Sequence, residues 1–565
     1  MDTGTLPTET SVPIGVPPGS WRREATHFPS TLSPFLAAAI PVIAAPFRAA
    51  FAGLGAWYDT LEYREIGGWV YTRLVPPGGV DGVAPPPELI RERAALAAET
   101  VRSDNLDGYL EEWSTLRDGF IAGVARLRGV DLRSLDDEAL AAHFGDVMVF
   151  SLDAFEVHLR LHGIYAMMLT DLAWTCRDLL GWDDAGALAL LSGLSEASTV
   201  PSDALAGLAA MARERPAVRR FIESGAADAS ALDAIDQEFA NAFAGYHERY
   251  GLRAVRYDIV DASMEERPAL TLRLIADQLR GGYDPVARAS EAIGQREARQ
   301  QEARRLLADR SEADRARFEQ VLRRAERWYG VREEKATMTW NEQTGLIRRV
   351  VLEMGRRLAE SSLLDDADDV FFLNSEEAGA ALAARHSARA PECREVVRRR
   401  RAELAWADAH PGPLTYGPDF DPRVDLEGLP DEIRFVTEAQ LWLIERAGHY
   451  VASPPRPARA CVTGIGAAGG TYTGTARVLM SETDFDKLQP DDVLVCPTTS
   501  PAWSVLFPNV GALVTDAGAV LSHSAIIARE FQIPAVVATG NATALLWDGQ
   551  RVIVDGNAGT VEVLA

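Results

Sequence analysis

The chain has little cysteine. Four cysteines occur among 565 residues, widely scattered and without a CxxC pair: Cys176, Cys393, Cys461 and Cys496. This usage argues against a disulfide scaffold and against a cysteine-based zinc site, and it favours a reducing compartment. We therefore expect a cytoplasmic protein with no metal site.

The sequence also lacks a surplus of positive charge. It has 57 basic and 82 acidic side chains, a formal net charge of −25, and a pI near 4.9. Nucleic acids and anionic membranes both attract a positive surface. We expect neither nucleic acid nor membrane among the partners.

Long hydrophobic runs are missing as well. The N-terminus has neither the basic nor the apolar region of a signal peptide. The most lipid-like stretch, FLAAAIPVIAAPF at 35–47, is 13 residues long and contains two prolines. A membrane-spanning helix needs about 20 apolar residues. The stretch is thus predicted to be a buried packing segment of a soluble protein.

The remaining composition is that of an ordinary globular protein, with 47% hydrophobic and 25% charged residues. The length predicts more than one domain. Residues 1–20, rich in Pro, Thr and Gly, are expected to be a flexible leader. Residues 21–452 are predicted to be mostly helical, because apolar residues recur at three- and four-residue intervals, as in 87–102, 290–326 and 344–364.

The pattern changes at SPPRPARA, residues 453–460, which predicts a stiff proline-rich linker. Short β-branched runs follow it, at 476–480, 493–497, 512–516, 535–539, 551–555 and 560–564, with one helix near 524–531. The predicted fold class is therefore multidomain, α plus α/β. A large, mostly helical N-terminal region precedes a compact β/β/α domain at 461–565.

One segment of this C-terminal unit carries the chemistry: TDAGAVLSHSAIIARE, residues 515–530. A strand leads through a small-residue turn to Ser522 and His523 at the start of a helix. Free N–H groups and the helix dipole favour a negative group there, so His523 is a candidate to accept a phosphoryl group. The alternative is a helix-capping or buried histidine without chemistry.

The segment resembles the swivelling phosphohistidine domain of phosphoenolpyruvate-utilising enzymes, with the pattern T-x-x-G-[GA]-x-x-[SC]-H-x-A-I-x-A-R followed by I-P-A-V. Ala519 stands where a second glycine is commoner. The resemblance implies that His523 carries a phosphoryl group between two sites, supported by Thr515, Gly518, Ser522 and Arg529. Arg529 is equally compatible with a packing role. Weaker similarity to the rifampin phosphotransferase branch covers 19–34, 246–275 and 344–377.

The resemblance also implies a donor. The sequence has no GxxxxGK[ST] loop, and we expect no ATP-grasp module within it. We therefore expect a separate ATP-binding, ATP-grasp-like partner that supplies ATP and Mg²⁺, with no cofactor bound tightly by this chain. The acceptor would be a hydroxyl on a small alcohol, phenol or natural product.

This makes the chain a phosphotransferase component. Two alternatives remain at this stage. The first is a non-catalytic binding or regulatory protein that retains the phosphohistidine domain. The second is a dehydratase that acts through a phosphorylated intermediate.

Candidates on the substrate side come from the helical region. Lys335 and Glu342 are the predicted acid–base groups. Arg348 and Arg349, with Arg356 and Arg357, are candidates to surround an anionic intermediate, although their default interpretation is a solvated helix face.

Three further patterns are given structural interpretations. His158 and His162 lie four apart, which is metal-ligand spacing, but no carboxylate completes a motif such as HExxH. Packing or surface roles are therefore favoured, with a place in a substrate pocket next. His27 is interpreted as structural. GIGAAGG at 464–470 precedes a strand rather than following one, so it is predicted to be a glycine-rich linker and not a dinucleotide loop.

Overall fold

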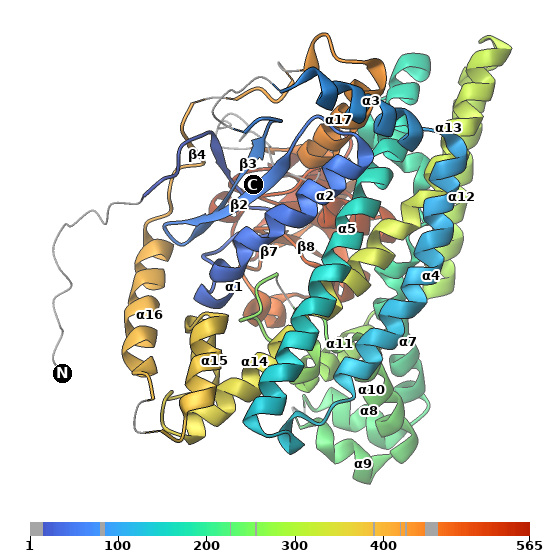
Figure 1. Cartoon of the computed structure of the whole chain (residues 1–565). Helices are drawn as coiled ribbons and strands as arrows, with labels where there is room; N and C mark the ends of the chain where they lie inside the picture. Colours follow the sequence, from blue (N-terminus) through green and yellow to red (C-terminus); the bar gives the residue numbers. More distant parts are fainter. Residues whose placement is uncertain are drawn as a thin grey trace.

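The computed structural model describes residues 15–79, 85–225, 228–254, 257–387, 390–418, 420–423, 426–446 and 461–564. Most of the predicted leader and the whole predicted 453–460 linker lie outside these residues. The described chain has a large helical part followed by a β domain, as predicted (Figure 1).

One long helix organises the helical part. α5 (Asp137–Leu180) has 44 residues, begins where Asp136 accepts the N–H of Ala139, and ends at Gly181 with φ 69°. Four other helices pack along it and bury its middle, as Figure 1 shows: α2 (Ala44–Leu54), α13 (Glu312–Ala336), α14 (Glu342–Glu360) and α17 (Asp431–Arg446).

The remaining helices surround this core. They are α1 (Pro34–Ala39), α3 (Pro87–Thr100), α4 (Ser103–Arg128), α6 (Asp184–Leu188), α7 (Glu196–Arg213), α8 (Pro216–Glu223), α9 (Leu232–Ile235), α10 (Gln237–Tyr250), α11 (Pro268–Arg280), α12 (Pro285–Leu306), α15 (Ser375–Ala384) and α16 (Cys393–Ala409). The predicted helical stretch 290–326 is divided between α12 and α13.

A π-helical turn joins α13 to α14. Thr337–Asn341 carries the chain from one helix into the next without a break. Such insertions are rare in helices and often occur at functional sites.

The helical part also contains a sheet that the sequence did not predict. Four strands in the order β2-β3-β1-β4 pack over α2: β1 (Trp21–Arg23), β2 (Thr60–Ile66), β3 (Trp69–Val75) and β4 (Thr415–Tyr416). β1 pairs with both β3 and β4, so it ties the two ends of the helical part together.

The C-terminal domain is one eight-stranded sheet with α18 (His523–Phe531) and α19 (Ala542–Leu545). The strand order is β5-β12-β11-β7-β8-β9-β10-β6, and β7 to β10 run parallel. The strands are β5 (Cys461–Thr463), β6 (Ile465–Ala468), β7 (Thr471–Val478), β8 (Asp492–Cys496), β9 (Val510–Thr515), β10 (Ala535–Val537), β11 (Arg551–Asp555) and β12 (Thr560–Val563). Each of the six predicted β-branched runs contains a strand.

The prediction of a glycine-rich linker at 464–470 is wrong. Residues 465–468 form strand β6, which pairs antiparallel with β10 at the sheet edge. The glycines allow close backbone contacts, since a Cβ at Gly466 would lie 2.3 Å from the carbonyl oxygen of Gly556.

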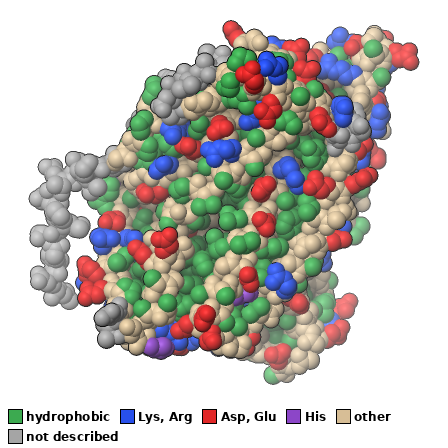
Figure 2. Space-filling view, viewed as in Figure 1, with side chains coloured by type: hydrophobic (Ala, Val, Ile, Leu, Met, Phe, Trp, Pro, Cys, Tyr) green, Lys and Arg blue, Asp and Glu red, His purple; other side chains and the backbone are tan. Residues whose placement is uncertain are grey.

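The apolar segment near the N-terminus is buried on one face only. Pro34–Leu54 comprises α1, the 3₁₀ turn Ile40–Ile43 and α2, and it is long and apolar enough to cross a membrane by length and composition. Only 22% of its most apolar 18-residue stretch is buried. Phe51 and Leu54 pack into the core, whereas Val42 is 48% exposed. Figure 2 shows apolar side chains between interspersed acidic and basic groups on this face.

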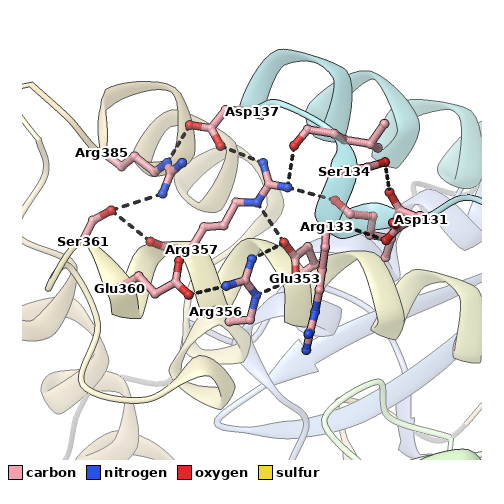
Figure 3. A network of polar contacts seen from close by, with 12 residues as sticks. Asp131, Arg133, Ser134, Asp137, Glu353, Arg356, Arg357, Glu360, Ser361 and Arg385 are labelled. Atoms are coloured by element: carbon pink, nitrogen blue, oxygen red, sulfur yellow. Dashed lines mark hydrogen bonds and ion pairs between the residues drawn. The ribbon is translucent and has the colours of Figure 1, made fainter.

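The expectation that the arginines of α14 form a solvated face is wrong for two of them. Arg348 and Arg357 are each 4% exposed. Arg357 bonds Glu353 and Asp137 at 2.9 Å, and it donates to the carbonyl groups of Leu132 and Leu135 (Figure 3). This network fixes α14 to the first turn of α5.

Replacing Arg357 tests this network. We expect Arg357→Met to lower the free energy of unfolding by about 3 kcal/mol or more, because Asp137 and Glu353 lose their buried partner. Arg356→Met is the matched control, since the neighbouring Arg356 also bonds Glu353 but is 36% exposed. We expect it to cost about 1 kcal/mol or less in urea unfolding. Equal losses would contradict a structural role specific to Arg357.

Candidate active site

A tight turn places His523 at the start of a helix. β9 ends at Thr515, and Gly518 in the turn adopts φ +114°, where a Cβ would lie 2.9 Å from Ser522 Oγ. Ser522 is the N-cap of α18: its Oγ accepts the N–H of Ala525 at 3.4 Å and donates to the carbonyl of Ala519 at 2.8 Å. The predicted position of His523 at the helix N-terminus is confirmed.

The other two predicted supporting residues brace the turn and the helix. Thr515 Oγ1 donates to the Ala517 carbonyl at 2.6 Å and stabilises the turn. Arg529 is buried and donates to the Ala467 carbonyl in β6 at 2.8 Å. Arg529 does not line the cavity described below, so its contact is a packing one.

His523 meets the helical part of the chain at Glu333. Its Nδ1 lies 3.2 Å from Glu333 Oε2, and the two side chains are 9% and 7% exposed. Burial alone would raise the pKa of Glu333, but the adjacent Arg332 guanidinium and the hydrogen bond with His523 lower this pKa to about 2. Glu333 is therefore an ionised acceptor at neutral pH.

This pairing determines the tautomer of His523. A carboxylate only accepts hydrogen bonds, so Nδ1 must carry the proton that it donates to Glu333. In the neutral ring the lone pair is then on Nε2. Nε2 is buried and has no hydrogen-bond partner among the described residues, so it is the nitrogen available as a nucleophile.

His523 lines a cavity of about 150 Å³ in the helical part. Aromatic side chains form much of its wall, while a connected polar group lies beside His523. The aromatic residues are Phe28, Phe47, Phe51, Tyr63, Phe155, Tyr257 and Trp340. The polar group consists of His27, His158, His162, Arg332, Glu333 and Lys335.

Lys335 is fully buried in this polar group, with Nζ 3.2 Å from His162 Nδ1. Burial and then the charge of Arg332 push the pKa of Lys335 well below its ordinary value, against the opposing effect of Glu333. Lysine occurs only twice among the 57 basic residues, at 335 and 487. A lowered pKa favours the neutral amine, which can act as a general base, whereas the permanently charged arginines cannot.

The two histidines of α5 lie in the cavity, so neither is a surface residue. His158 Nδ1 contacts Thr339 Oγ1 at 2.9 Å, and burial, then the nearby Lys335 and Arg332, lowers the pKa of His158 well below 6.5. Their spacing of four puts both on the helix face that meets α13. His27 also lines the cavity and pairs with Glu24 at 3.3 Å.

Three predicted substrate-side residues are elsewhere. Arg348 forms a bidentate pair with Glu266, with both N–O distances 2.8 Å, and also donates to backbone carbonyls. Arg349 donates to the Arg128 carbonyl at 2.8 Å. Glu342 is half-buried, its desolvation raises its pKa to about 7, and it does not line the cavity. These side chains are used in contacts within the helical part and do not surround His523.

A second, smaller pocket of about 30 Å³ also borders His523. It is mostly polar and is lined by Thr26, His27, Tyr257, Arg332, Thr498, Thr499, Ser522 and His523. Hydroxyl groups and a guanidinium suit the oxygens of a phosphoryl group. Within the described chain, no group of three or more His, Cys, Asp or Glu side chains has the arrangement of a metal site.

Sequence reasoning missed Glu333, Arg332 and the three threonines of this pocket, Thr26, Thr498 and Thr499. The string Arg332-Glu333-Glu334-Lys335 gives no sign of which carboxylate faces His523, because the partners are 190 residues apart. In the polar group, the rarity of lysine singles out Lys335, and the spacing of four singles out His158 and His162.

Two family models match the chain. Residues 488–559 match the PEP-utilising enzyme mobile domain, and residues 157–333 match the rifampicin phosphotransferase fourth domain. The first includes His523, and the second includes Glu333, His158 and His162. The two residues that pair across the interface thus come from two different family modules.

Curated relatives cover most of the chain. "Uncharacterized phosphotransferase YvkC" of Bacillus subtilis is 27% identical over 447 residues, 77% of this chain and 51% of that protein. A "Rifampicin phosphotransferase" of Streptomyces sp is 30% identical over 439 residues, 74% and 47% respectively. "Chondramide synthase cmdD" of Chondromyces crocatus is 30% identical over 420 residues, 73% and 10%. The chain spans about half the length of the first two relatives.

The pairing of His523 with Glu333 predicts an acid dependence of stability. The pKa of Glu333 is lowered from 4.5 to about 2 on folding, so its contribution is complete above pH 4.5 and is lost as the pH falls towards 2. We expect wild type to be more stable than Glu333→Gln above pH 5 in urea unfolding, with the difference shrinking below pH 4.5.

The neighbouring Glu334→Gln is the matched control, because that carboxylate bonds Trp113 Nε1 at 2.8 Å and not His523. A difference between wild type and Glu333→Gln that grows on acidification would contradict the assignment.

Proposed function

Residues 488–559 form a PEP-utilising enzyme mobile domain beside a rifampicin phosphotransferase fourth domain, and on this premise we propose that the chain is the phosphohistidine-carrying component of a phosphotransferase. His523 accepts the phosphoryl group and passes it to a hydroxyl acceptor in the cavity. The observation that carries the proposal is the contact between His523 and Glu333, which leaves Nε2 unpartnered at the cavity wall.

In the first step, Nε2 attacks the terminal phosphorus of the donor. The P–O bond to the donor breaks, and a P–N bond forms on a ring that keeps its Nδ1 proton. That ring is then cationic, and the ionised Glu333 stabilises it whenever the two are in contact. The start of α18, at His523 and Ser524, offers N–H groups to the phosphoryl oxygens.

In the second step, the acceptor hydroxyl attacks the same phosphorus. Its proton passes to neutral Lys335, the O–P bond forms, and the P–N bond breaks to release neutral imidazole. Arg332 and the hydroxyl groups of Thr498 and Thr499 are positioned around the small polar pocket, where they suit the equatorial oxygens. Because His523 leaves as a neutral ring, no further proton is needed on it.

The donor is a nucleotide held by an ATP-binding module outside residues 1–565, which also supplies Mg²⁺. Two observations support this. The sequence has no GxxxxGK[ST] loop, and curated relatives that share this region are about twice as long. Several relatives are named rifampicin phosphotransferase, so rifampicin represents one class of acceptor. Which acceptor binds here depends on the shape and charge of the cavity.

Phosphate on His523 tests the carrier role. The protein is incubated with labelled ATP or labelled phosphoenolpyruvate and Mg²⁺, with and without lysate of the source organism. We expect an acid-labile gain of one phosphoryl group in wild type, read by intact mass, that is lost in His523→Ala and kept in His162→Ala. The absence of label under every donor would contradict phosphoryl transfer and leave a binding protein.

Lys335 separates the two steps. We expect Lys335→Met to be labelled as wild type is, but to lose label to an acceptor about 10²–10⁴-fold more slowly, because a general base contributes that much. Lys487→Met, which removes the other lysine at an exposed position, is the control. Transfer at the wild-type rate in Lys335→Met would exclude Lys335 as the base.

A further inference from the structure

The cavity beside His523 is small for a ligand site. Its volume of about 150 Å³ is below the 300–1,000 Å³ typical of drug-sized ligands, and it equals that of an engineered apolar cavity that holds benzene. A compound of several fused rings would extend beyond this volume.

The walls are suited to a flat apolar body. Trp340 lies against Phe155 with ring centroids 4.9 Å apart, and His158 stacks on Phe155 at 5.9 Å and 9°. On the α2 side, Phe47 contacts Phe51 and stacks on Tyr63. Because these rings support one another, the wall has a fixed shape and presents edges and faces to a bound ring.

The charges at the cavity are already balanced. Arg332 is ion-paired with Glu333, and Glu333 also bonds His523. Burial favours the neutral forms of Lys335 and His158, whose pKa values are both lowered. A ligand carboxylate or ammonium would therefore be desolvated without a free partner of opposite charge, which is costly.

From this volume, wall and charge balance we propose that the acceptor is an uncharged alcohol about the size of a single six-membered ring. Its ring lies among the aromatic side chains, and its hydroxyl points to the polar group beside His523. The proposal rests on the phosphotransferase function above, because it names the substrate class of that same cavity.

Binding is measured by calorimetry with the full chain, without any phosphoryl donor. The probes are benzyl alcohol, mandelate, which adds a carboxylate to the same ring and hydroxyl, and estradiol, which has four fused rings. We expect benzyl alcohol to bind at least about tenfold more tightly than mandelate, the loss that follows from burying an unpaired charge, and estradiol not to bind in the cavity.

A matched pair of variants locates the site. Ala50 lines the cavity, whereas the adjacent Ala49 is exposed on the same helix. We expect Ala50→Leu to weaken benzyl alcohol binding at least about tenfold, because the added methyl groups occupy the space of the ring, and Ala49→Leu to leave it unchanged. Ala336→Leu, from the opposite wall, repeats the test if Ala50→Leu does not fold, as judged by circular dichroism.

Equal effects of Ala50→Leu and Ala49→Leu, or tighter binding of mandelate or estradiol than of benzyl alcohol, would overturn the proposal. Failure of the substrate class is distinct from failure of the function. If His523 becomes labelled but benzyl alcohol does not bind, only the proposed acceptor class is contradicted. Binding without any label on His523 retains the ligand class and contradicts the phosphotransferase.

Discussion

The structure depends functionally on one buried contact, between His523 of the C-terminal domain and Glu333 of α13. An ionised glutamate next to Arg332 is tolerated in this apolar setting only because its oxygens have partners. The same contact sets the proton on Nδ1, leaves Nε2 free for phosphorus, and places that nitrogen beside Lys335 and the aromatic cavity. The turn at Gly518, the Ser522 cap and the start of α18 together position the His523 ring against the Glu333 carboxylate.

The contact is part of a larger apolar interface. Val520 and Leu521, which precede His523, pack into the same hydrophobic cluster as α5, α13 and α17, and the N–H of Leu521 donates to the Arg446 carbonyl at 2.8 Å. Exposing these two side chains would cost about 1.5–3 kcal/mol each. In the proposed mechanism the phosphoryl carrier leaves this position to meet a donor, and the observed arrangement is the acceptor side of that proposed cycle. The proline-rich linker expected at 453–460, outside the described residues, is the proposed tether.

Local patterns were sufficient for much of this account. The helical periodicity, the β-branched runs and the Gly518–Ser522–His523 turn are encoded by neighbouring residues, so the helix start at His523 could be predicted. Long-range pairing could not. Strand β1 pairs with residues about 400 positions away in the sequence. The sequence around Arg348 is typical of an exposed helix face, and only the fold shows that Arg348 pairs with Glu266. Lys335 was named from sequence, but its proposed role as a base depends on its burial against α5, and Glu333 is distinguishable from Glu334 only in three dimensions.

The most direct test of the central contact is the tautomer of His523. Nitrogen-15 NMR of histidine-labelled protein, with His523→Gln to assign the signals, reports which ring nitrogen carries the proton. The account predicts that the neutral ring carries its proton on Nδ1 and has a bare Nε2, with this preference lost in Glu333→Gln. A proton on Nε2 in the wild-type protein would contradict it, because the nitrogen assigned to attack phosphorus would then have no lone pair to offer.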